Sequence, residues 1–156
     1  MIGFASFAAL RSNEEGAMAI ETAIVAPVLL LLSLGGFQVS SLVARQTELQ
    51  SAMAEAQAVA LATDPDTSAK LTTIQQIVMA STNLEASAVT VTNAYRCNNT
   101  DIYVTSTSYY AVGDKVSSYV KINVTDRYNP IWTQFGIGKA ISMDQTRYIQ
   151  FKQATK

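Results

Sequence analysis

Histidine is absent from the 156-residue sequence, and cysteine occurs only once, at Cys97. A chain without histidine lacks the usual general base, the commonest metal ligand and the usual pH switch of proteins. One thiol forms neither an internal disulfide nor a zinc site. No phosphate loop or nucleophile triad is present in the sequence either. We therefore expect no enzyme, no cofactor and no metal site.

Charged residues are also few, at 15% of the chain, and the formal net charge is −1. Domains that bind nucleic acid usually carry a strongly basic face. A nearly neutral chain argues against that class, so we expect no nucleic-acid partner.

A long uncharged run stands out against this composition. The 23 residues from Thr22 to Ala44 contain no charge, and as a helix they measure ~34 Å against a hydrocarbon layer of ~30 Å. The run predicts a membrane helix, which we place at residues 17–39. Pro27 lies inside it and removes one backbone donor, which membrane helices tolerate, often with a kink.

Beyond the apolar run the same helix is expected to continue to residue 63. An apolar stripe at helical spacing predicts that this part packs one face on a soluble domain; its members are Leu42, Leu49, Met53, Ala56 and Ala60. Asp64 is a candidate cap and Pro65 a candidate first residue of a second helix over 65–82.

From Ala88 onward the apolar period changes from helical spacing to two. Alternation or short β-rich runs predict strands near residues 89–95, 102–105, 109–112, 116–126 and 140–151. Strands that follow one another without helices between them imply an antiparallel sheet. The predicted fold class is α+β, with the long helix and the second helix packed on a small antiparallel sheet.

Glu21 lies at the start of the apolar run, five residues after Gly16. The segment Gly16-Ala17-Met18-Ala19-Ile20-Glu21 resembles the processing site of type IV prepilins and pseudopilins. In that family a membrane peptidase cuts after the glycine, and the fifth residue of the product is glutamate. The resemblance implies a cut between Gly16 and Ala17, with Glu21 as the fifth mature residue.

The wider stretch EGAMAIETAIVAPVLLLLSLGGF is most similar to the TadE-like minor pseudopilins of the Tad (tight adherence, Flp) pilus family. Thr22 stands where the short Flp-type major pilins usually have tyrosine, and more than a hundred residues follow the helix. Both departures argue against the role of major subunit. A looser similarity covers residues 115–150, which resemble the closing strands of that family.

The resemblance implies a pilin-like architecture of three parts: a leader over 1–16, the long helix over 17–63 and a soluble domain over 64–156. It also implies a single-pass protein of the inner membrane that acts in pilus assembly and adhesion and is itself a candidate pilus component. Its soluble domain would lie in the periplasm or outside the cell. The implied partners are a prepilin peptidase, the inner-membrane Tad assembly platform, other pilins or pseudopilins, and membrane lipid.

The orientation rests on this resemblance, because the charges flanking the helix are nearly balanced. Arg11 is the only basic residue before the apolar run and Arg45 the first one after it, so the positive-inside rule gives little direction.

A carboxylate at position 21 has a physical use once Ala17 carries a free amine. Residues four apart share one helix face, and a charge at the bilayer centre costs ~2.5–3.5 kcal/mol, less near the interface. An amine on the same or a neighbouring chain offsets that cost and sets an axial register. The alternative is a glutamate that is simply hydrated at the membrane surface.

Two other interpretations of the whole chain stay open. One is an uncut single-span envelope protein with an interaction domain, and the other is a binding domain secreted through a signal peptide cut near Gly35 or Gly36. Cys97 is a candidate for an interchain disulfide outside the cytoplasm, or else a semi-buried free thiol.

Overall fold

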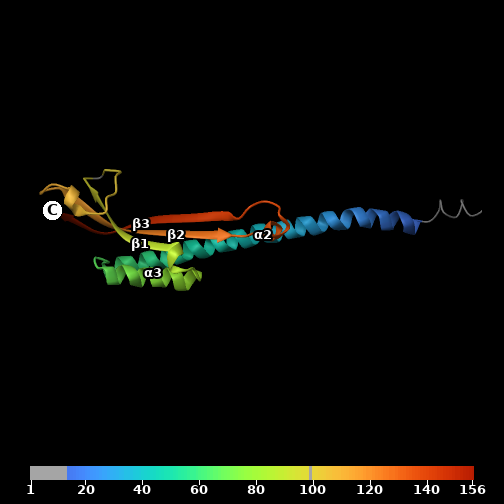
Figure 1. The fold of residues 1–156 in the computed structure, drawn as a ribbon, viewed down its shortest axis with the longest axis horizontal. Helices are drawn as coiled ribbons and strands as arrows, with labels where there is room; N and C mark the ends of the chain where they lie inside the picture. The colour runs from blue at the N-terminus through green and yellow to red at the C-terminus, as the bar shows by residue number, and fades with distance from the viewer. Residues whose placement is uncertain (1–13, 99) are drawn as a thin grey trace, which may run out of the picture. The chain divides into compact units, whose positions relative to one another are not determined.

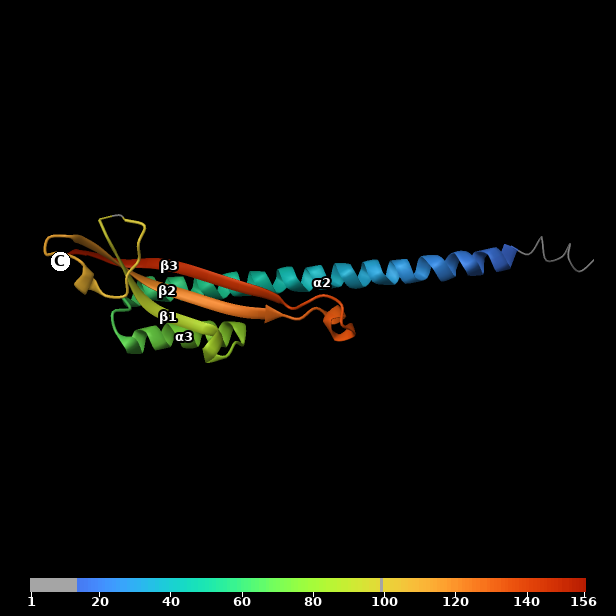
Figure 2. The ribbon, with the colours of Figure 1, turned by 45° about the horizontal axis from the view of Figure 1, so that its top comes forward.

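The computed structural model describes residues 14–98 and 100–156, so the predicted leader lies almost entirely outside the described residues. The chain divides into two compact units, which meet between Ser41 and Leu42. The helix α2 (Glu14–Thr63) contributes to both units. The second unit also contains α3 (Ser68–Thr82), β1 (Val89–Cys97), β2 (Lys115–Tyr128) and β3 (Ile141–Thr155), which Figures 1 and 2 label.

The N-terminal unit is the first part of α2, and it buries almost none of its apolar surface. Leu30, Leu31 and Leu32 are 71%, 69% and 67% exposed. Leucine and alanine favour a helix, but nothing within this unit covers their side chains. Pro27 lies inside the helix, as predicted.

The C-terminal unit has one hydrophobic core between helices and sheet. Its α2 part contributes Leu49, Met53, Ala56 and Ala60, four of the five residues of the predicted stripe, all 2% exposed or less. The other contributors come from α3 and the three strands, and include Ile74, Val78, Val89, Val120, Ile122, Val124, Met143 and Ile149. The alanines of α2 allow the helix to approach the sheet closely, because they place little volume at the contact.

The sheet is antiparallel with strand order β1-β2-β3. β2 is therefore central, and Val120, Ile122 and Val124 on its inner face are fully buried. Residues opposite one another on neighbouring strands point to the same face. The register Val89↔Val124 and Val120↔Ile149 thus brings apolar residues of all three strands to the inner face.

The predicted α+β class is confirmed: a long helix, a second helix and a three-stranded antiparallel sheet make up the described chain. α3 lies against β1 (Figure 2). The helix α2 begins at Glu14, three residues before the predicted start, so that Gly16 is part of the helix.

The predicted start of the second helix is wrong. α3 begins at Ser68, and Pro65 is buried in the loop before it. Asp64 ends α2 in a left-handed conformation, with φ 48°, and its carbonyl oxygen accepts from Lys70 Nζ at 2.9 Å. A left-handed residue turns the chain sharply, so the capping predicted for Asp64 serves the end of one helix and not the start of the next.

Two predicted strands are also absent from the described structure. Residues 102–105 form only an isolated bridge, in which Tyr95 and Val104 exchange both backbone hydrogen bonds. Of residues 109–112, Tyr109 ends a short 3-10 turn, η2 (Thr107–Tyr109), and the other three follow it. The side chains of Tyr109 and Val112 are 74% and 91% exposed, as expected in a surface loop and not in a packed strand.

Candidate functional site

The candidate site begins at Gly16, in the first turns of α2. Gly16 is exposed, and a Cβ atom built on it meets no atom within 4 Å. Its backbone is helical, and glycine in a helix is about 1 kcal/mol less favourable than alanine. Neither space nor backbone conformation within the described residues requires glycine here.

Ala17 follows inside the helix, and Glu21 lies one turn further along it. Glu21 is exposed. The next residue, Thr22, donates its hydroxyl to the carbonyl oxygen of Met18 at 2.8 Å, within the same turn. Because that bond satisfies the Thr22 hydroxyl locally, Glu21 remains the polar group of this turn that faces outward.

A shallow groove runs along this side of the helix. Glu21 lines it with Met18, Thr22, Val25, Ala26 and Leu29. These positions recur at three and four residues, so they form one seam on the helix surface. A carboxylate in an otherwise apolar seam is suited to contact a partner that brings both an apolar helix and a positive charge.

The apolar part of α2 meets the length and hydropathy of a membrane span. The best window lies in Met18–Thr63, has a mean hydropathy of 2.0, and none of it is buried. A core helix of a soluble domain would be mostly covered. A long helix whose apolar part is uncovered fits a single-pass membrane anchor.

Cys97 lies apart from this helix, at the end of β1. It is 6% exposed. Burial raises the pKa of its thiol, and so does the hydrogen bond that the thiol shares with the Asp114 carboxylate. An interchain disulfide at Cys97 would need this end of the sheet to open, and it stays a prediction.

Asp114 organises the loop around Cys97. Its carboxylate accepts from Asn98 Nδ2 at 3.0 Å and from the backbone N–H of Ala111 at 2.9 Å. Three donors in all, the Asn98 amide, the Ala111 N–H and the Cys97 thiol, hold the pKa of Asp114 below its usual value. Sequence reasoning missed this network, because Cys97 and Asp114 lie 17 residues apart and the segment between them has no regular period.

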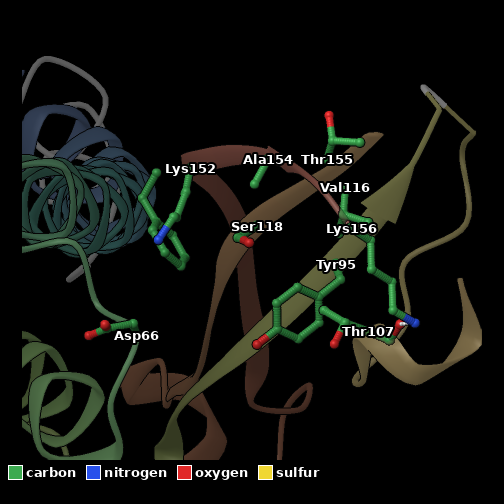
Figure 3. A pocket seen from close by; sticks show the side chains of 10 residues that line it. Asp66, Tyr95, Thr107, Val116, Ser118, Lys152, Ala154, Thr155 and Lys156 are labelled. Carbon is green, nitrogen blue, oxygen red and sulfur yellow. Dashed lines mark hydrogen bonds between the residues drawn. The ribbon is translucent and has the colours of Figure 1, made fainter. Parts of the chain in front are cut away.

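A cavity of about 260 Å³ opens near the same end of the sheet (Figure 3). Lys156 at its edge already donates Nζ to the carbonyl oxygens of Thr107 and Tyr110. Asp66 on the opposite wall pairs with Lys70 at 2.9 Å. Lys152 also lines the cavity, and its positive charge is among the causes that lower the pKa of Asp66.

Comparison with known families agrees with the geometry of the N-terminal helix. A family model described as "TadE-like protein" matches residues 16–57. The match begins at Gly16 and ends within the part of α2 that packs on the sheet. No curated protein and no solved structure matches the chain.

A TadE-like match suggests a part in Tad pilus assembly. The resemblance seen in the sequence is confirmed over residues 16–57, where the N-terminal helix is similar to the TadE-like family.

Proposed function

We propose that this chain is a minor pseudopilin of a Tad (Flp) pilus, made as a prepilin and cut between Gly16 and Ala17. The observation that carries the proposal is an exposed glycine without a structural need, followed at the fifth position by a carboxylate in an apolar seam. A peptidase needs access to the bond that it cuts; Gly16 is exposed, and a Cβ atom built on it meets no described atom within 4 Å.

After the cut, residues 17–39 hold the protein in the inner membrane as a single span, and the soluble domain lies in the periplasm or outside the cell. The uncovered leucines of α2 support this anchor. Removing such side chains from water is worth ~1.5–3 kcal/mol each. A helix with this much exposed apolar surface is stable only in lipid or when it packs against other helices.

Glu21 then takes part in subunit assembly. Its carboxylate pairs with an α-amine, either its own at Ala17 or that of a neighbouring subunit, and the pair fixes the axial register between helices. The partners on this pathway are the prepilin peptidase, the inner-membrane assembly platform, and other pilins or pseudopilins with the same kind of helix.

The first amino acid of the protein extracted from membranes tests the proposal directly. The proposed processing gives Ala17, an uncut envelope protein gives Met1, and a signal peptide gives a residue beyond position 35. Either of the last two results would overturn the proposal.

The matched variants are Gly16→Leu and Gly35→Leu. Both glycines lie in α2, and neither has an atom within 4 Å of a built Cβ, so the leucine costs the fold little at either place. Gly16→Leu should block processing and leave Met1 or the full mass, whereas Gly35→Leu should still begin at Ala17. If Gly16→Leu is still cut before Ala17, the glycine is not the recognition element.

A further inference from the structure

The C-terminal unit separates its charges between its two layers. Residues 42–88, which contain the helices, carry two basic and five acidic side chains, and residues 89–156, which contain the sheet, carry eight basic and four acidic ones. The first stretch has a net charge of −3 and the second of +4. The near-neutral total of the chain conceals this separation.

Three basic residues of this stretch lie on the face turned away from the helices, which we call the outer sheet face. The register places Tyr119, Lys121 and Arg127 of β2 on this face, because their neighbours Val120, Ile122 and Val124 point into the core. Arg96 lies on it too, with its guanidinium 5.9 Å from the ring centroid of Tyr103.

An aromatic cluster holds the loop residue Tyr103 in a fixed position on this face. Tyr103 stacks on Tyr148 with centroids 4.1 Å apart, and meets Tyr119 edge to face at 5.2 Å. Lys121 Nζ lies 5.8 Å from the ring of Tyr148. Rings packed on one another hold the loop residue Tyr103 on the strands, so the cations stand on a preformed surface. One acidic strand residue, Asp144, shares the face.

The acidic groups of the helical layer, defined as residues 42–88, are exposed. Glu55 and Glu85 are exposed, and the Glu48 side chain is 45% exposed. The two basic residues of this layer are already engaged: Arg45 with Glu48 and Asp126, and Lys70 with Asp66. The surface that the helical layer offers to a partner is therefore negative.

The packed core lies between α2 and the outer sheet face, so Lys121 cannot reach Glu55 of the same molecule. We propose that the outer sheet face binds the helical layer of a second copy of this chain. The charge complementarity of the two surfaces selects this occupant, because each copy carries both halves of the contact.

The arrangement also fixes the kind of assembly. The complementary surfaces lie on opposite sides of the unit, so the contact is heterologous and uses a different surface on each partner. Heterologous contacts build rings or open arrays and not closed two-fold dimers. This inference concerns the C-terminal unit and does not depend on processing at Gly16.

The test uses two copies of the full-length chain, each with a different affinity tag, in one non-ionic detergent. One tagged copy is captured, and the amount of the other copy that is captured with it is measured. The sheet-face variant is Lys121→Glu with Arg127→Glu, and the helical-layer variant is Glu55→Lys with Glu85→Lys. Lys139→Glu with Lys152→Glu is the control: it changes the net charge as much as the sheet-face variant, at exposed positions outside the outer sheet face.

The wild-type chain should be captured by itself at low salt and lose most of this capture at 1 M salt, where the screening length is ~3 Å. Each face variant alone should lose capture by roughly tenfold or more, because repulsion replaces attraction. The control should resemble the wild type. A mixture of the two face variants should recover capture, since the reversed sheet of one then meets the reversed helices of the other.

Recovery in the mixture also shows that both variants are folded. The proposal is wrong if the wild-type chain does not capture itself, if the control loses as much as the sheet-face variant, or if the mixture fails to recover. Binding of heparin by the wild-type chain without self-capture would assign the outer sheet face to an anionic polymer instead.

A carbodiimide cross-link locates the contact. The reagent joins a lysine amine to a carboxylate at zero length, and a mixture of ¹⁴N- and ¹⁵N-labelled chains identifies links between molecules. We expect links of mixed label between Lys121 and acidic residues of the helical layer. Links of Lys121 that occur only within one chain would contradict the proposal.

Discussion

Arg45 Nε donates to Asp126 Oδ2 at 2.6 Å and joins the helix α2 to the central strand β2. The two side chains are 23% and 12% exposed, and Arg45 Nη1 also pairs with Glu48 at 2.8 Å. Burial by itself lowers the pKa of Arg45, but the hydrogen bonds from Asp126 and Glu48 outweigh it and raise the pKa above its usual value. Arg45 is the first charged residue after the apolar run, so this bond lies where the helix begins to pack on the domain.

Replacing Asp126 by alanine should destabilise the C-terminal unit by about 1.5–3 kcal/mol, because a half-buried guanidinium loses its charged partner. Glu48→Ala is the control, since Glu48 is an exposed partner three residues along the helix and such pairs contribute ~0–1 kcal/mol. Urea unfolding of the full chain in detergent, followed by the fluorescence of the single Trp132, measures both. Equal losses in the two variants would mean that the bond to Asp126 adds nothing beyond a surface ion pair.

Ile122→Ala should lower the free energy of unfolding by about 2–5 kcal/mol. Ile122 is fully buried on the central strand, and truncation there loses transfer free energy and leaves a cavity. Val112→Ala is the matched control, since Val112 is 91% exposed and such a change costs within about 0.5 kcal/mol. A loss below 1 kcal/mol in Ile122→Ala would contradict the core described for this unit.

Much of the fold follows from the periods of the sequence. The stripe from Leu49 to Ala60 has helical spacing over a long stretch, and Val120, Ile122 and Val124 alternate over a whole strand. Long, regular patterns of this kind record which face is buried. They predicted the long helix, the second helix, the central strand and the antiparallel sheet.

The parts that sequence reasoning missed depend on contacts between distant residues. The run Ile102-Tyr103-Val104 has β propensity, yet it forms one bridge because Tyr103 packs on Tyr119 and Tyr148. The outer sheet face was missed for the same reason: Arg96 comes far before Lys121 in the chain and joins the same face only through the pairing of β1 with β2. At the N-terminus the predicted role of Gly16 came from the resemblance of Gly16 to Glu21 to the processing site of type IV prepilins.

Low pH should weaken the loop that holds Cys97. The pKa of Asp114 is below its usual value in the folded chain because the carboxylate accepts hydrogen bonds from Asn98, Ala111 and Cys97. The stabilising effect of the Asp114 carboxylate is therefore complete above the ordinary pKa of aspartate. It disappears as the pH falls through the lower pKa that Asp114 has in the folded state. The difference in urea midpoint between the wild type and Asp114→Asn should be present at pH 7 and should shrink below about pH 4.

Asp144→Asn serves as the comparison, because Asp144 is exposed on the outer sheet face. Its difference from the wild type should change less over the same pH range. A difference for Asp114→Asn that stays constant with pH would show that the carboxylate charge does not support the loop.

The Cys97 thiol should react slowly with iodoacetamide at neutral pH. Burial and the bond to Asp114 raise its pKa, so the thiolate that reacts is scarce as well as covered. An exposed thiol, made by Ser108→Cys in a Cys97→Ser chain, should react roughly tenfold faster or more. Equal rates, or a dimer on a non-reducing gel, would instead support the interchain disulfide.

The Glu21→Gln protein should still be found in the membrane and should still be cut before Ala17. Its association with other subunits that carry a pilin-type helix should be reduced. The amide keeps the shape of the side chain and removes the charge that would pair with an amine. Loss of such a pair in a weakly hydrated site costs about 1.5–3 kcal/mol, which corresponds to a tenfold or greater loss of co-purified subunits. Thr22→Val is the control, because its hydroxyl bonds only within its own helix. Unchanged association in Glu21→Gln would show that the carboxylate is hydrated at the membrane surface, and a processing failure confined to Glu21→Gln would assign it to recognition by the peptidase.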